Sequence, residues 1–212
     1  MVSGGGRVTL PPPLKNQRNR LKVAITDIAT VQIGYQFRER IEPVSDGTHS
    51  VIQIRDFDDN YILNPSKLVR VKIDKLSENY IVNKGDVLFL SRGHKNWAAP
   101  ILEALEDTIA VSHFFIIKLH NEKVLPEYLA WYINQPPAQQ FLYSLAKRGS
   151  HMPIIAKGAF EGLTIEIPSI ITQRKIVEIS RLMKKEDQLL GDIQKKRTQL
   201  INSICLQASK TE

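Results

Sequence analysis

Hydrophobic and polar positions follow different patterns in successive parts of this chain. From residue 21 to about residue 119, short runs rich in β-branched and aromatic residues are separated by turn signals such as Asp46-Gly47, Asn64-Pro65 and Gly85-Asp86. These runs predict strands. They are TVQIGYQF, SVIQIRDF, KLVRVKI, DVLFLS and IAVSHFFIIKL, starting at residues 30, 50, 67, 86 and 109. The last run is continuously apolar, so we expect one strand that is buried on both faces.

A helical pattern begins behind Pro126, where apolar residues recur three and four positions apart. Pro136-Pro137 are expected to break this helix. The segment AQQFLYSLAK after them predicts a second short helix that ends at Gly149. A loop, a turn and one more strand, which ends at Pro168, complete this part of the chain.

The last segment predicts a single long helix with Thr172 as its N-cap. From 172 to 207 such a helix would measure roughly 54 Å at 1.5 Å per residue. Alternating steps of three and four follow a mostly apolar seam with polar breaks at Glu186 and Arg197, which is typical of a coiled coil. The apolar seam residues are Ile176, Ile179, Met183, Leu190, Ile193, Leu200 and Ile204. We expect the helix to project and pair with a partner helix; the alternative is that it folds back on its own domain.

These patterns together predict an α+β protein. We expect a flexible basic arm over 1–20, a mainly β domain with short helices over 21–169, and a long coiled-coil dimerisation or spacer helix over 170–212. No internal repeat is visible.

Charge is distributed unevenly along the 212 residues, which have a net charge of +7. Residues 1–22 contain five basic and no acidic side chains, and residues 169–212 contain nine basic and five acidic ones. The middle of the chain is slightly acidic, so binding of nucleic acid would depend on local basic patches. The single cysteine, Cys205, suits a reducing compartment, and the absence of an apolar signal or membrane-length run predicts a cytoplasmic protein without membrane contact.

The sequence contains no pattern that is typical of an active site. It has no glycine-rich nucleotide-binding motif, no nucleophile elbow and no histidine spacing that suits a metal. Asp56, Asp58 and Asn60 have the spacing of a calcium loop, but Tyr61 and Lys67 stand where glycine and glutamate are needed. We therefore expect no catalytic residue, metal or cofactor, and interpret this stretch as an acidic turn.

Two acid-free stretches have the composition of nucleic-acid contacts. SRGHKNWAAP (91–100) offers Arg, Lys and Asn, which can bond base edges, although Trp97 is expected to belong to the core. AKRGSHMPIIAKG (146–158) suits phosphate and local base contacts. Part of it, RGSHMP, looks like the remnant of an expression tag, but SLAK precedes it and we interpret it as native. The predicted DNA-binding residues are Arg92, Lys95, Asn96, Lys147, Arg148, Ser150, His151 and Lys157, with Arg38 and Arg55 as weaker candidates.

The order of several short motifs resembles the specificity (S) subunit of type I restriction–modification systems. That family shows a Gly-Asp-[VIL]-Leu strand opening, a Pro-x-[YF]-Leu helix start and a Gly-Ser loop, and 85–88, 126–129 and 149–150 match them in order. An [IVL]-Pro step follows at 167–168, and then a long helix that opens near Gln173. The family usually has Glu-Gln at this opening, where the present chain has Thr172-Gln173. The resemblance covers roughly residues 21–207.

The resemblance implies a non-catalytic subunit whose target-recognition domain binds double-stranded DNA. It implies methyltransferase subunits, and restriction subunits, as partners; S-adenosylmethionine belongs to the methyltransferase. A full S subunit has two recognition domains and two helices, so this chain resembles a half-subunit. Two half-subunits, of one kind or of two, would pair antiparallel through their helices and read a bipartite target.

Two other classes of function stay open at this point. The chain could be a coiled-coil assembly module that does not bind DNA. It could also be a metal-dependent nuclease that uses Asp56 and Asp58. Duplex binding that weakens steeply with salt would favour DNA recognition over the assembly module. Metal-dependent DNA cleavage by the purified chain would identify a nuclease.

Overall fold

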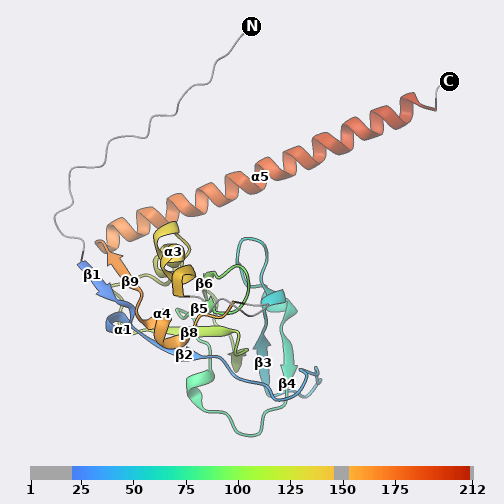
Figure 1. Cartoon of the computed structure of the whole chain (residues 1–212). Coiled ribbons are helices and arrows are strands. Elements are labelled where there is room, and N and C mark those ends of the chain that lie inside the picture. Colours follow the sequence, from blue (N-terminus) through green and yellow to red (C-terminus); the bar gives the residue numbers. More distant parts are fainter. Residues whose placement is uncertain (1–20, 146–152, 211–212) are drawn as a thin grey trace.

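A four-stranded antiparallel sheet forms the centre of the molecule, in the order β2-β8-β5-β6 (Figure 1). The structure, a computed structural model, describes residues 21–145 and 153–210. The strands of this sheet are β2 (Ala29–Ile33), β8 (Phe114–Leu119), β5 (Val87–Leu90) and β6 (Ala98–Pro100). Gly85, in the turn that leads into β5, has a φ of 95°, which glycine adopts without the strain of a side chain.

The two central strands, β5 and β8, are buried on both faces because alternate side chains enter two different cores. In β5, Val87 and Phe89 pack in the first core, whereas Leu88 and Leu90 pack in the second. This explains why β5 and the first four residues of β8 are continuously apolar. The central sheet therefore separates the helical side of the molecule from a second sheet.

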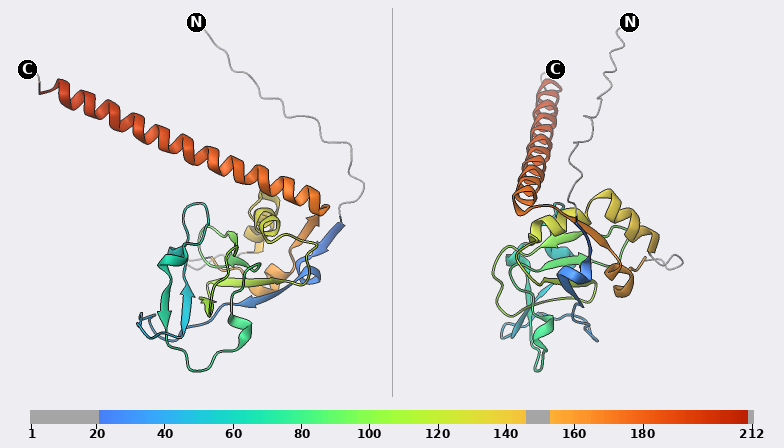
Figure 2. Two further views of the ribbon diagram at one scale, coloured as in Figure 1. Left: turned by 180° about the vertical axis from the view of Figure 1, so that it is seen from behind. Right: turned by 90° about the vertical axis from the view of Figure 1, so that its left-hand side faces the viewer.

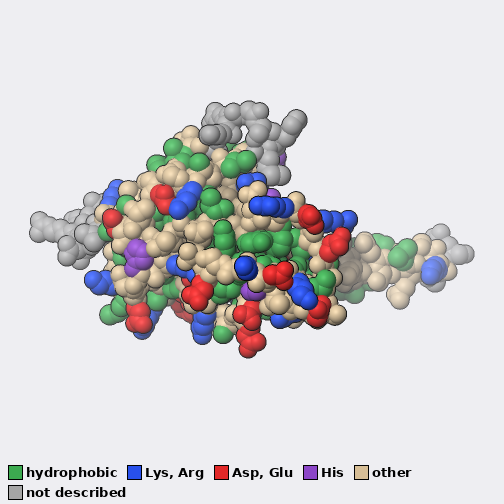
Figure 3. Space-filling view, turned by 90° about the horizontal axis from the view of Figure 1, so that it is seen from below, with side chains coloured by type: hydrophobic (Ala, Val, Ile, Leu, Met, Phe, Trp, Pro, Cys, Tyr) green, Lys and Arg blue, Asp and Glu red, His purple; other side chains and the backbone are tan. Residues whose placement is uncertain are grey.

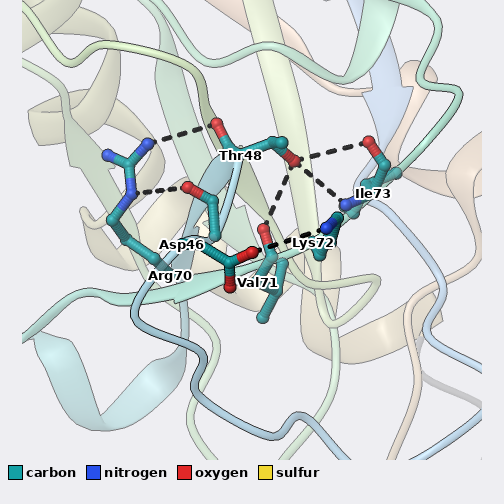
Figure 4. Close-up of polar contacts among 7 residues, drawn as sticks. Asp46, Thr48, Arg70, Val71, Lys72 and Ile73 are labelled. Atoms are coloured by element: carbon teal, nitrogen blue, oxygen red, sulfur yellow. Dashed lines mark hydrogen bonds and ion pairs between the residues drawn. The ribbon is translucent and has the colours of Figure 1, made fainter.

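The second sheet has the order β4-β3-β7 and covers the second core. Its strands are β4 (Val69–Val71), β3 (His49–Ile52) and β7 (Thr108–Ala110), with β3 parallel to β7 and antiparallel to β4. Figure 4 shows how the turn before β3 is fastened to β4: Arg70 Nε donates to the Gly47 carbonyl at 2.9 Å, and Lys72 pairs with Asp46 at 3.4 Å. Both basic side chains are thus engaged with this turn.

Short helices and a two-stranded sheet cover the first core. The helices are α1 (Ile25–Ile28), α2 (Pro126–Ile133), α3 (Pro136–Leu145) and α4 (Lys157–Glu161), and the strands are β1 (Leu21–Ala24) and β9 (Thr164–Ile167). Three short 3-10 helices lie in the connections, at Ile54–Asp56, Pro65–Lys67 and Glu78–Tyr80. Phe160 of α4 stacks on Phe89 with 4.5 Å between ring centroids, which joins the helical layer to the central sheet.

The long helix α5 (Ile170–Ala208) has 39 residues and is about 58 Å long. The Ser169 hydroxyl caps it by accepting from the Thr172 amide, so the predicted N-cap, Thr172, is wrong by three residues. Ile176 and Val177 pack against the first core, whereas the side chains from 181 to 208 are exposed. Both views of Figure 2 show α5 continuing beyond the body, as the coiled-coil pattern predicts.

Besides this packing, hydrogen bonds hold α5 to the body at two places. Gln173 is fully buried: its Oε1 accepts from Leu125 N at 2.9 Å, and its Nε2 donates to the carbonyls of Lys123 and Pro168, both at 2.9 Å. Three turns further on, Lys184 Nζ donates to the Asn60 carbonyl at 3.2 Å. None of the helices in residues 21–145 and 153–210 is long and apolar enough to cross a membrane.

The α+β class and the long helix are confirmed, but several predicted elements are wrong in detail. The run 109–119 forms two strands, β7 and β8, rather than one. The first helix ends before Pro136 as predicted, but the second helix begins at Pro136 rather than at Ala138, because proline fits the first turn of a helix. The segment 91–100 ends in strand β6, and β1 and α4 were not predicted. The predicted arm over 1–20 and the predicted helix end at Gly149 lie outside the described residues.

Candidate functional site

The two acid-free segments lie side by side at the edge of the central sheet. Arg92 and Ile154 form an antiparallel bridge, and two backbone bonds flank it, from Gly93 N to the Pro153 carbonyl at 3.0 Å and from Ile155 N to the Ser91 carbonyl at 2.9 Å. Side chains alternate across this short ladder, so Ser91 and Ile155 are buried while Ile154 is exposed and Arg92 is half-exposed. We call residues 91–97 and 153–156 the joined loops.

Asn96 holds the first of these segments in shape. Its Nδ2 donates to the Leu90 carbonyl at 2.8 Å, and the side chain is half-buried. One amide hydrogen and the Oδ1 atom remain for other partners. Asn96 therefore supports the loop, and it can bond a base edge only in the orientation that Leu90 fixes. Trp97 is 6% exposed and belongs to the second core, as the sequence indicates.

His113 lies beneath the joined loops and was not predicted. Its carbonyl accepts from both the amide and the hydroxyl of Ser91, each at 2.9 Å. Partial burial lowers the pKa of the His113 imidazole, and the neighbouring Arg92 guanidinium lowers it further. His113 is therefore predominantly neutral at pH 7 and adds no second positive charge beside Arg92.

A surface pocket of about 320 Å³ opens beside the joined loops. Its lining combines aromatic rings with ammonium, imidazole and amide groups, which can stack on bases, bond base edges and contact phosphate. The lining residues are Tyr61, His94, Lys95, Asn96, Trp97, Asn134, Gln139 and Tyr143. Lys95 is exposed at its rim. Tyr61, Asn134, Gln139 and Tyr143 come from distant parts of the chain, and no local sequence pattern marks them.

The remaining predicted residues lie apart or are outside the described residues. Lys157, in α4, pairs with Glu161 at 3.5 Å. Arg38 is exposed in the segment after β2, and Arg55 is exposed in the 3-10 helix after β3. Lys147, Arg148, Ser150 and His151 fall in the segment that the structure does not describe. The structure thus brings Arg92, Lys95 and Asn96 together with the residues that follow Pro153.

The acidic stretch after β3 is a tight loop whose carboxylates bond its own backbone. Asp56 accepts from Gln53 N at 2.7 Å, and burial raises the pKa of its carboxyl. Asp58 Oδ1 accepts from Asn60 N at 2.9 Å and from Ile62 N at 2.8 Å. Among residues 21–145 and 153–210, no group of three acidic, histidine or cysteine side chains could hold a metal. Both aspartates therefore have a structural role in this loop.

The side of the body turned away from α5 has a mixed character. Figure 3 shows acidic and basic side chains interspersed there, among apolar ones, over the described part of the surface. Because charges of both signs alternate on this side, it does not present an extended positive surface to nucleic acid. The joined loops and the pocket are better candidates for a contact with nucleic acid.

Residues 20–203 match the family described as type I restriction modification DNA specificity domain. No curated protein sequence is significantly similar to this chain.

Several solved structures share the fold. The S subunit of a type I restriction-modification system from M. genitalium aligns with a TM-score of 0.53 and 12% identity, over 81% of this chain and 41% of that one. The HsdS subunit from Thermoanaerobacter tengcongensis aligns with a TM-score of 0.59 and 17% identity, over 84% and 45%. A chain from a study of complex assembly and conformational transition of a type I R-M system gives a TM-score of 0.50 and 15% identity, over 88% and 42%. This chain thus spans less than half the length of these structures.

Proposed function

Because this chain belongs to the family of type I restriction–modification DNA specificity domains, we propose that it recognises a DNA target for partner methyltransferase subunits. The partners would supply S-adenosylmethionine and the chemistry, and this chain would choose the site without being catalytic itself. Restriction subunits would be directed in the same way.

The main support for this proposal is the ladder that joins the two acid-free loops. Residues 91–97 and 153–156 contain no acidic side chain, and Arg92 and Lys95 of the first loop lie beside a pocket of aromatic and amide groups. Arginine bonds guanine through two hydrogens, and amides bond adenine, so this surface can read base edges in a groove. Lysine at the rim suits phosphate.

We further propose that α5 pairs antiparallel with the long helix of a second recognition unit. A large apolar side chain that is exposed on a helix is stabilised by burial against a partner, and α5 has a row of them. Two recognition domains at opposite ends of a helix pair would read a bipartite target, in which a stretch of unread base pairs separates two half-sites.

Methylation mapping tests DNA recognition. The chain is co-expressed with methyltransferase subunits of its own system, and modified adenines are located across the genome. We expect a split target, with Arg92→Ala relaxing the choice at one position at a cost of about 1–3 kcal/mol and Lys95→Ala weakening all targets alike. Unchanged target choice and affinity in both variants would contradict the assignment of these loops. A complete absence of new methylation would contradict the proposed function itself.

The purified chain should also bind duplex DNA with an affinity that falls steeply as salt rises, because phosphate contacts release counterions. Binding that is absent at low salt would favour an assembly module that does not contact DNA.

A further inference from the structure

Two charged residues interrupt the apolar seam of α5, and they restrict which helix can pair with it. The seam residues Ile179, Met183, Leu190, Ile193, Leu200 and Ile204 are 56–62% exposed, so the body of the molecule does not cover them. Glu186 and Arg197 interrupt the same row, and both are exposed. A partner helix that covers the seam must also accept these two opposite charges.

The seam is separate from the face that α5 turns toward its own domain. Gln173, Val177 and Lys184 contact the body, and at about 100° per residue they lie on a stripe roughly 100° away from the seam. Ile176 is the exception, because it is a seam residue that packs against the first core. The seam is therefore open to a partner from residue 179 onward.

Each charge in the seam has apolar neighbours one helical turn away on both sides. Leu182 and Leu190 flank Glu186, and Ile193 and Ile201 flank Arg197. Pairing would bring both charges into apolar contact, and a partly buried charge without a partner is strongly unfavourable. The register that pairs these charges with each other is consequently preferred over registers that do not.

We propose that the partner is a second copy of this chain, antiparallel, with the two-fold axis between Gly191 and Asp192. In this register Glu186 of each copy faces Arg197 of the other, which gives two ion pairs across the axis. The other seam layers are wholly apolar: Ile179 faces Ile204, Met183 faces Leu200, and Leu190 faces Ile193. This inference rests on the proposed pairing of α5 and adds its partner and register.

Other arrangements of two copies leave the charges unpaired. A shift of one heptad in either direction places Glu186 against Leu190 or Ile204 and places Arg197 against Ile179 or Ile193. A parallel pair places Glu186 against Glu186 and Arg197 against Arg197. Beyond the last layer, Ile176 would face Gln207, a polar residue, which suits a position where the isoleucine already packs on its own domain.

A charge-reversal cycle on the full chain tests the register by sedimentation equilibrium. Glu186→Arg and Arg197→Glu each create two like-charge contacts, so we expect each to weaken self-association about tenfold or more, which corresponds to about 1.4 kcal/mol or more. The double variant restores both pairs with reversed polarity. An equimolar mixture of the two single variants should also associate, because one chain then has arginine at both seam positions and the other has glutamate at both.

Matched controls carry the same reversals on the outward face of α5. Asp192→Arg and Lys195→Glu should leave self-association unchanged, and circular dichroism should show the same helix content in all variants. Single reversals without effect, or a double variant that does not recover, would overturn the register. A parent chain that stays monomeric to about 100 µM would overturn the choice of partner. Salt-dependent DNA binding by such a monomer would support the proposed recognition function and contradict only the proposed dimer. A dimer that does not bind DNA would support the proposed pairing and contradict the recognition function.

Discussion

Gln173 shows how one side chain fixes the junction between two parts of the molecule. Its amide bonds the backbone at Lys123, Leu125 and Pro168, which belong to the loop before α2 and the end of β9. The side chain is 0% exposed, so these groups have no access to water as an alternative partner. The first turn of α5 is thereby held in one orientation on the body.

Replacing Gln173 by leucine should destabilise the protein by about 3 kcal/mol, because three buried backbone groups lose their partner. Urea denaturation followed by fluorescence of the tryptophans measures this change. Arg174→Leu, at the exposed neighbouring position, is the control and should change stability by less than about 0.5 kcal/mol. Equal effects of the two substitutions would mean that the amide network contributes little.

His113 makes stability depend on pH in a predictable direction. Burial and Arg92 lower the pKa of its imidazole in the folded protein, so the unfolded chain binds this proton more tightly than the folded one does. The contribution of His113 to stability is therefore present at pH 7.5 and is lost as the pH falls below about 6.5 toward the lowered value. His113→Gln should reduce the fall in melting temperature between pH 7.5 and 5.0, whereas His94→Gln, at an exposed position, should not.

At the scale of elements, local patterns predict what is periodic and miss what depends on distant contacts. The seam of α5 predicts a projecting helix because its period extends over many turns. The split of 109–119 into β7 and β8 was missed, because both halves are equally apolar and only their pairing with β3 and β5 separates them. Strand β6 was missed because Ala98 and Ala99 have weak strand propensity and are held there by pairing with β5.

The candidate site could be predicted only in part for the same reason. The absence of acidic side chains marked both loops in the sequence. Their junction through Arg92 and Ile154 depends on the sheet, and Asn134 enters the pocket because its amide bonds both the amide and the carbonyl of Ala98. Such long-range contacts leave no trace in a local pattern.

The loop over 58–62 is the element that supports α5 at Lys184. Asp58 fixes it from within, Tyr61 has a φ of 62°, and the Tyr61 ring stacks on Trp97 at 4.8 Å. Asp58→Ala should therefore release the loop, destabilise the protein by about 1–2 kcal/mol and accelerate hydrogen exchange at the amides of Asn60 and Ile62. Asp59→Ala, a matched change in the same loop, should leave exchange at these two amides slow.

At the scale of the whole molecule, stability and the proposed self-association depend on different surfaces. The double variant Leu190→Glu and Ile193→Glu should abolish self-association, because it buries four carboxylates at the centre of the helix pair. At a concentration low enough for the parent chain to be monomeric as well, the melting temperature of the body should not change, since both side chains are exposed in α5. Sedimentation velocity and thermal denaturation measure the two effects. Gln188→Glu with Asn202→Glu, which adds the same charge off the seam, is the control.

The attachment of α5 at both Gln173 and Lys184 has a consequence for DNA geometry. The midpoint of the two attachments lies about 13 residues from the proposed two-fold axis, so in the antiparallel pair the two bodies would be centred about 39 Å apart along the helices. One turn of B-DNA measures about 34–36 Å. In the proposed complex with DNA, both bodies would therefore approach the duplex from the same side, and the opposite side would stay open to the proposed methyltransferase partners.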